Sequence, residues 1–200
     1  MPAEVRADFD EVAAYGQRLR DAGSSVADVM RAIYGVDLPA EAYALDRALA
    51  AGLDLPLVVT VHPWAFIDDA ARDTDEDWSR GVEDGAFEAW PRFLPLLHLA
   101  AEDAVHGNHV IGYDLDALAA GKPTIYGYDE AHPPQGDGPL AELGPSLLAV
   151  LAEWMADHHR MLEAQLRSPG NRGFGSITSP QVERAAAQLR AIEALRREVG

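Results

Sequence analysis

The sequence contains no cysteine in 200 residues. Disulfides, thiolate metal ligands and thiol nucleophiles are therefore excluded. No apolar run approaches the roughly 20 residues that span a bilayer, and the first eight residues have neither the basic nor the apolar region of a signal peptide. We expect a cytoplasmic chain that has no membrane partner and is long enough to bury a sizeable core.

Positive charge is also scarce. The chain has 16 Lys and Arg residues and 33 Asp and Glu residues, which gives a formal net charge of −17. Such a chain repels nucleic acid backbones and anionic lipid, so neither is expected as a partner. A basic protein is the natural complement, although an acidic surface also serves solubility alone. The acidity belongs to the body of the chain, since the segment 179–200 carries four arginines against three glutamates.

Several catalytic signatures are missing. No serine lies in a G-x-S-x-G elbow, and no phosphate-binding loop or HExxH pair occurs. We therefore predict a protein that is not an enzyme and needs no cofactor. One alternative stays open: His98, Glu102 and His106 are spaced at i, i+4 and i+8, and on a helix they would share one face. Two imidazoles and a carboxylate could hold zinc with a water of lowered pKa, as in a metal-dependent hydrolase.

The first quarter of the chain predicts helices. Apolar residues recur at helical spacing over 3–20 and again from Val26 to Ile33, where Ser24 or Ser25 can cap the start and Gly35 can end the helix. A third helix should begin at Leu38-Pro39 and end near Gly52, because proline suits a first helical turn.

The middle of the chain predicts an antiparallel sheet. Its candidate strands are short, apolar and rich in β-branched residues, with Gly-containing turns at 107–108 and 121–122 between them. Asp114 ends one of these runs, where its carboxylate can accept backbone N–H groups. The acidic stretch 68–88 is expected to be an exposed insertion or a short solvated helix. The predicted strands are 55–61, 93–99, 109–115 and 123–128.

The last third predicts a loop at 131–138 and a long helix over 143–166. A connector at 167–178 and a terminal helix at 179–200 should follow, with Ser179 as cap and Pro180 in the first turn. The terminal helix has an apolar face that must be covered by the body or by another subunit, so a homo-oligomer is possible. The expected fold is α+β, with a domain at 1–166: N-terminal helices, a central mainly antiparallel sheet, a long C-terminal helix and an appended terminal helix.

Four short motifs then occur in an order that resembles the SMI1/KNR4 (SUKH) family, over roughly residues 26 to 158. Asn108 replaces the aspartate usual in the family, and the tail beyond Arg167 has no counterpart. The motif residues are Gly35 with Leu38, Pro39 and Tyr43; Phe93 to Leu96; Gly107, Asn108, Tyr113 and Asp114; and Gly121 to Tyr126.

The resemblance implies protein recognition. Many members of the family are immunity proteins that bind and neutralise toxin domains, and others are regulatory scaffolds. The acidic body suits a basic toxin domain, bound stoichiometrically through a central aromatic or apolar anchor. The two tryptophans among the candidate contacts could equally be core residues. The candidate contact residues are Trp64, Asp73, Asp75, Glu76, Asp77 and Trp78.

Overall fold

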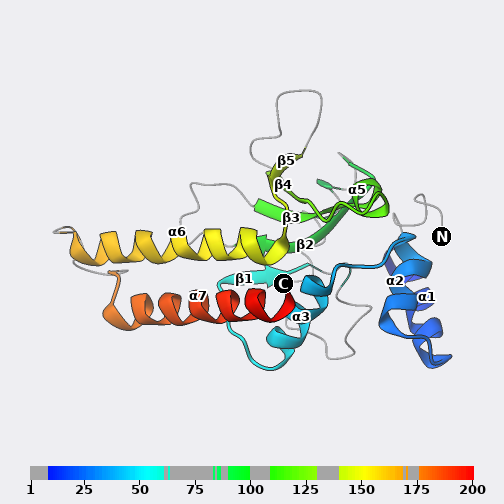
Figure 1. The fold of residues 1–200 in the computed structure, drawn as a ribbon, viewed down its shortest axis with the longest axis horizontal. Helices are drawn as coiled ribbons and strands as arrows, with labels where there is room; N and C mark the ends of the chain where they lie inside the picture. The colour runs from blue at the N-terminus through cyan, green and yellow to red at the C-terminus, as the bar shows by residue number, and fades with distance from the viewer. Residues whose placement is uncertain are drawn as a thin grey trace. The chain divides into compact units, whose positions relative to one another are not determined.

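The computed structural model describes residues 9–60, 63, 83, 85–86, 90–99, 109–129, 140–168, 170 and 176–200 (Figure 1). These residues form the predicted α+β fold, with helices first, an antiparallel sheet in the middle and two long helices last. The helices are α1 (Phe9–Asp21), α2 (Val26–Tyr34), α3 (Ala40–Ala50), α5 (Leu115–Ala119), α6 (Leu147–Arg167) and α7 (Ser179–Val199). The strands are β1 (Leu57–Val59), β2 (Phe93–Leu99), β3 (His109–Asp114), β4 (Ile125–Asp129) and β5 (Ala141–Gly144).

The chain divides into two compact units, each built from two stretches of sequence. Residues 1–39 and 56–145 form a sheet unit, and residues 40–55 and 146–200 form a helical unit. A proline stands at each of the three points where the chain passes from one unit to the other: Pro39, Pro56 and Pro145. Proline ends regular hydrogen bonding, so these positions suit the end of one element and the start of the next.

The sheet is a meander in which every neighbouring pair of strands is antiparallel, in the order β1-β2-β3-β4-β5. All seven residues of β2 are buried, which explains why this strand reads as one apolar run rather than as an alternation. The predictions for β2, β3 and β4 are confirmed within a few residues, and β1 is shorter than predicted.

The predicted helix over 143–166 begins too early. Residues Ala141–Gly144 form β5, and α6 starts only at Leu147. Pro145 disfavours helical geometry at the residue before it, and the Ser146 hydroxyl accepts a hydrogen bond from the Ala149 N–H at 3.2 Å as the N-cap. The short helix α5 between β3 and β4 was likewise absent from the sequence prediction.

The register between β2 and β3 shifts between Pro95 and Leu97, opposite Gly112. A side chain at Gly112 would not fit there, because an added Cβ would lie 2.0 Å from the Leu94 carbonyl oxygen and 2.9 Å from the Pro95 Cα. The glycine thus allows the backbones of two strands to approach closely at this irregularity.

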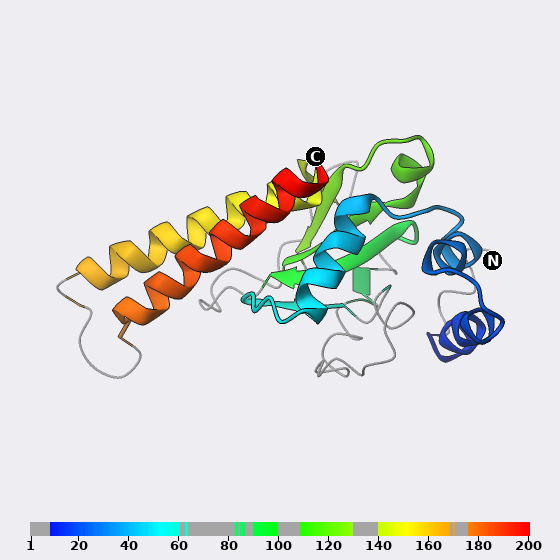
Figure 2. The ribbon, with the colours of Figure 1, turned by 60° about the horizontal axis from the view of Figure 1, so that its bottom comes forward.

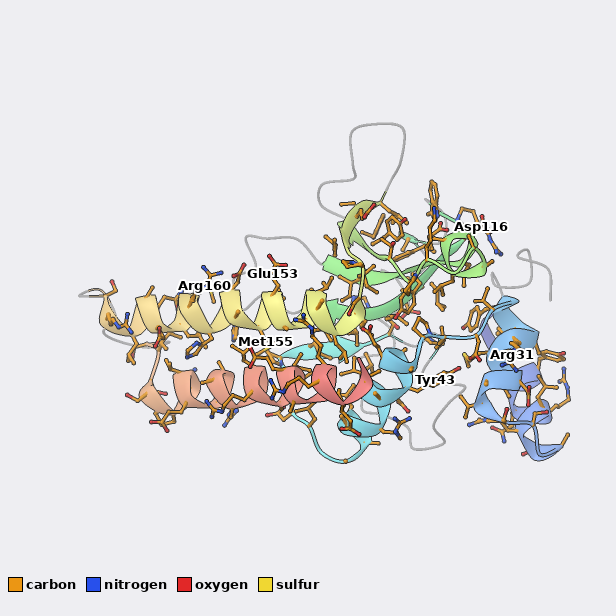
Figure 3. The ribbon with its side chains drawn as sticks, in the orientation of Figure 1. Arg31, Tyr43, Asp116, Glu153, Met155 and Arg160 are labelled. Carbon is orange, nitrogen blue, oxygen red and sulfur yellow. The ribbon has the colours of Figure 1, made fainter. Side chains whose placement is uncertain are left out.

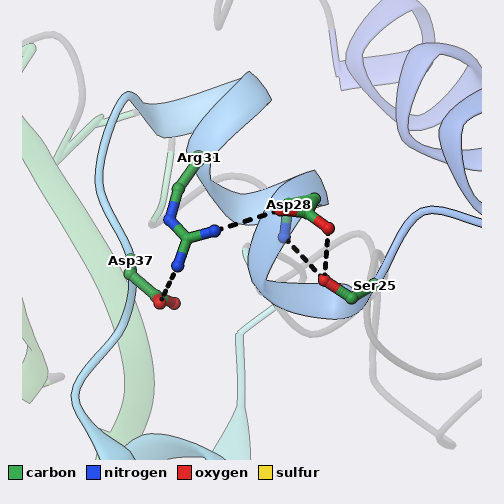
Figure 4. A network of polar contacts seen from close by, with 4 residues as sticks. All are labelled: Ser25, Asp28, Arg31 and Asp37. Carbon is green, nitrogen blue, oxygen red and sulfur yellow. Dashed lines mark hydrogen bonds and ion pairs between the residues drawn. The ribbon is translucent and has the colours of Figure 1, made fainter.

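Helix α2 has the caps that the sequence predicted. The Ser25 hydroxyl accepts the Asp28 N–H, and Gly35 ends the helix at φ 77°. Figure 4 shows how Arg31 then joins this cap to the following turn, with bonds of 3.0 Å to Asp28 and 2.8 Å to Asp37. The hydrogen bond from Ser25, followed by the charge of Arg31, lowers the pKa of the Asp28 carboxyl.

The helical unit consists of α3, α6 and α7. Helices α6 and α7 lie side by side and antiparallel, and α3 packs against both (Figures 1 and 2). Met155 lies between α6 and α7 and is fully buried, as are Ala185 and Ile192 of α7 (Figure 3). Part of the apolar face of the terminal helix is therefore covered within the helical unit, while Val182, Leu189 and Leu195 are only half-buried.

Polar contacts hold α3 and the segment that follows it to the two long helices. Glu41 of α3 accepts hydrogen bonds from the Ser146 hydroxyl and the Leu148 N–H, both at 2.8 Å, at the positive end of α6. The Gln188 side chain donates to the Asp54 carbonyl at 2.7 Å. Helix α7 begins at Ser179, within the predicted range 179–200, but its N-cap is Thr178 rather than Ser179, in a capping box with Gln181.

None of the helices in the described part of the chain combines the length and apolar character needed to cross a bilayer.

Candidate protein-binding surface

The contact residues proposed from the sequence cannot be placed. Trp64, Asp73, Asp75, Glu76, Asp77 and Trp78 lie outside the described residues, as do Glu102, His106, Gly107 and Asn108. Within the acidic stretch 68–88, Glu83 is described and is buried, so the expectation of a fully exposed insertion is wrong at that residue.

The helix on which the metal-site alternative depended is not present over its first half. His98 lies in strand β2, with Val58 and Val110 opposite it on the neighbouring strands. The His98 side chain is only 2% exposed, and burial lowers its pKa to about 4, so the imidazole is neutral at pH 7. In the described ranges no three His, Cys, Asp or Glu residues come together in a way that could hold a metal ion.

Several residues of the family-like motifs lie in the described part of the chain, either in the core or at the start of α3. Leu38 is buried just before α3, and Tyr113 is fully buried in β3. Pro39 precedes the first residue of α3, and Tyr43 is half-buried on that helix. Leu38 and Tyr113 therefore contribute to the core, while Pro39 and Tyr43 remain partly accessible.

Asp114 is the best-defined polar residue of the sheet unit. One carboxylate oxygen accepts the Ala117 N–H at 2.7 Å as the N-cap of α5, and the other accepts the Trp90 indole N–H at 2.7 Å. The predicted role of this carboxylate as an acceptor of backbone N–H groups is confirmed. Asp114 therefore fixes both the turn after β3 and the orientation of a tryptophan that precedes β2.

A partly exposed aromatic surface lies around this contact. Trp90, Tyr126 and Leu140 pack against a buried cluster and remain partly accessible. Tyr126 pairs across the strands with Glu142 of β5, so both side chains lie on the same face of the sheet, and Glu142 is exposed. The buried cluster beneath the surface consists of Ala86, Phe93, Val110 and Tyr128.

Charged residues border the aromatic side chains. Asp116, labelled in Figure 3, is 72% exposed and forms an ion pair with Arg92, whose Nε lies 2.9 Å from its carboxylate. The backbones of the same segments are joined by the Leu115 N–H, which donates to the Arg92 carbonyl at 2.9 Å. We call the group formed by Trp90, Tyr126, Leu140, Asp116 and Glu142 the Trp90–Tyr126 surface.

This surface combines features of protein-binding sites. Tryptophan, tyrosine and arginine are the residues most enriched among those that dominate binding energy, and a polar rim commonly surrounds them. Trp90 is also held in place by Asp114, so little side-chain entropy is left to lose on binding. The arrangement provides an anchored aromatic centre with carboxylates at its border.

Sequence reasoning missed Trp90, Tyr126 and Glu142. The alternation of Tyr126 and Tyr128 in β4 was the available signal, because residues two apart share one face of a strand. The sequence places Glu142 beside Tyr126 only if residues 141–144 form strand β5, and local periodicity instead predicts a helix that starts at residue 143.

Acidic charge is concentrated in the unit that carries this surface. The sheet-unit sequence, 1–39 and 56–145, holds 24 acidic and 8 basic residues, for a net charge of −16. The helical-unit sequence holds 9 acidic and 8 basic residues, for a net charge of −1. The two units thus differ sharply in the field that they present to a charged partner.

Comparisons of the chain with family models, with curated proteins and with solved structures gave no match. The likeness to the SMI1/KNR4 family therefore depends on the motif residues alone.

Removing the Asp114 carboxylate tests its double role. We expect Asp114→Ala to lower the free energy of unfolding by about 2 kcal/mol, because both the cap of α5 and the bond to Trp90 are lost. Asp116→Ala is the matched control and should cost less than about 1 kcal/mol, since its ion pair is exposed. Urea unfolding monitored by tryptophan fluorescence measures both. Equal losses would show that the two bonds of Asp114 do not stabilise the fold.

Proposed function

We propose that this chain is an immunity-type protein that neutralises a basic toxin domain by binding it one to one, through the Trp90–Tyr126 surface of its sheet unit. The observation that carries the proposal is the coincidence of that anchored aromatic surface with the unit that holds nearly all of the net negative charge. The order of the family-like motifs supports the same class of function.

The two features have different physical roles. A net charge of −16 raises the rate of encounter with a basic protein and orients it, and this effect weakens as salt screens the charges. The aromatic side chains supply affinity, because burying them removes apolar area from water and excludes water from neighbouring polar contacts. A chain of this kind acts by occlusion, so it needs no catalytic group of its own.

Binding to inactive forms of the basic proteins encoded beside this chain tests the proposal. We expect one of them to bind with one-to-one stoichiometry by calorimetry, with an affinity that falls as salt is raised. Tyr126→Ser should weaken that complex about 30-fold or more. Trp90→Phe, which keeps an aromatic side chain of smaller size but loses the hydrogen bond to Asp114, should weaken it less.

The matched control is Trp154→Phe, because Trp154 is also half-buried but lies on α6 in the nearly neutral helical unit. Its affinity should equal that of the unaltered chain. Circular dichroism and urea unfolding of each variant separate lost contacts from lost folding. Absence of any basic partner would overturn the proposed function. A partner that binds all three variants equally well would remove the Trp90–Tyr126 surface from it.

A further inference from the structure

Strand β5 ends the sheet on one side. It is the last strand in the order β1-β2-β3-β4-β5, and its only strand neighbour in the described part of the chain is β4. Ala141, Glu142 and Leu143 are all exposed, and Gly144 is half-buried. A terminal strand carries a row of backbone N–H and C=O groups that point away from the sheet, and these can pair with an added strand.

The other terminal strand is less accessible. Val59 of β1 is buried, and Thr60, which follows it, donates from its N–H to the Leu96 carbonyl and from its hydroxyl to the Pro95 carbonyl. These two bonds hold the end of β1 to β2. Leu57 of β1 is half-buried and Val59 is buried, whereas three of the four residues of β5 are exposed. The exposed edge of the sheet is therefore the one at β5.

Leu143 gives this edge an exposed apolar side chain. At 43% exposure it is the only large apolar side chain in the described residues that is classed as exposed. It lies over Gly127 of β4, where an added Cβ would come within 3.0 Å of the leucine Cδ1. Glu142 points to the opposite face, beside Tyr126. The edge thus offers an apolar side chain on one face and a carboxylate on the other.

We propose that β5 binds an extended segment of the basic partner as an additional strand, in which basic and apolar residues alternate. The inference rests on the proposed function and specifies how the partner is held. A residue of the added strand opposite Leu143 would be apolar, and the next residue, on the other face, would place its positive charge beside Glu142. Backbone bonds to β5 supply affinity, and the alternation supplies specificity.

A second copy of the chain fits this edge less well. Pairing two β5 strands would bring together two sheet units of net charge −16, and like charges repel. The strand is also only four residues long and is followed by Pro145. Short strands and flanking prolines limit extended edge-to-edge association, while a short peptide strand can still be added.

A synthetic peptide tests the inference without the whole partner. The probe is a short, end-blocked peptide that alternates lysine and valine, and its control has proline at the central valine. We expect the full chain to bind the alternating peptide at least about tenfold more tightly than the proline peptide, because proline removes a backbone donor and breaks the strand. Hydrogen exchange by NMR should show slowed exchange of amides within 141–144 only with the alternating peptide.

Leu143→Lys should reduce peptide binding at least about tenfold, since it removes the apolar contact and adds a like charge. Its exposed position lets the variant fold. Glu153→Lys on the exposed face of α6 is the control, because it changes the net charge by +2 against +1 for Leu143→Lys and so adds more positive charge away from β5 (Figure 3). Equal binding of both peptides, or unchanged exchange at 141–144, would overturn the inference, as would concentration-dependent dimers that Leu143→Lys abolishes. A whole partner that binds Leu143→Lys normally would overturn it too, while leaving the proposed function intact.

Discussion

Gly112→Ala should lower the free energy of unfolding by about 3 kcal/mol or more. The new Cβ would overlap the Leu94 carbonyl group and approach the Pro95 Cα, both of which are backbone atoms of β2. Backbone atoms cannot turn aside as a side chain can, so β2 and β3 must separate at the irregularity in their register. The lost contacts lie in the middle of the sheet, among buried side chains.

Gly127→Ala is the matched control in the adjacent strand. Its Cβ would meet the Leu143 side chain at 3.0 Å, and that side chain is exposed and able to move. We expect a loss below about 1 kcal/mol. Urea unfolding followed by far-UV circular dichroism measures both variants. Similar losses for the two would show that the β2–β3 backbones can separate more easily than their geometry indicates.

His98 should make the fold sensitive to mild acid. The pKa of this histidine is lowered from 6.5 to about 4 in the folded chain, because burial disfavours the charged imidazolium. Between these two values the unfolded chain binds the proton more readily than the folded chain, so stability falls as the pH falls. The contribution is complete above pH 6.5 and is lost by about pH 4, and it amounts to about 3 kcal/mol.

The measurement compares the free energy of unfolding at several pH values for the unaltered chain and for His98→Leu. We expect the unaltered chain to lose about 3 kcal/mol more than the variant between pH 7 and pH 4. The Asp28 carboxyl, whose pKa is lowered from 3.8, contributes below this range. Parallel curves for His98→Leu and the unaltered chain would show that His98 is protonated as easily when folded as when unfolded.

The candidate surface was only partly predictable. Asp114 was recognised as an acceptor of backbone N–H groups because a carboxylate at the end of an apolar run commonly caps the next turn. Its bond to Trp90 joins residues 24 apart in sequence, and no local pattern indicates such a pair. The proximity of Tyr126 to Glu142 depends on the register between β4 and β5, and no local pattern indicates that register either.

The failure of the sequence to predict strand β5 also has a non-local cause. Leu143, Leu147 and Leu151 are four residues apart, so the helical period continues upstream of the true start of α6. Pairing with β4 outweighs that period, because it gives the backbone of 141–144 partners that a helix interrupted by Pro145 would not supply. Local periodicity cannot reveal a competing strand partner elsewhere in the chain.

The sequence by itself determined the α+β class, the caps of α2, the apolar run of β2 and the acidic character of the body. Each follows from neighbouring residues: hydroxyl and glycine caps, β-branched apolar runs and counted charges. Only the tertiary structure decided that Glu41 binds the start of α6, 105 residues from Ser146, that Gly112 faces the backbone of β2, and that charge and aromatic surface belong to one unit. Those outcomes depend on which distant segments pack together, and that choice is made by burial over the whole chain rather than by local preference.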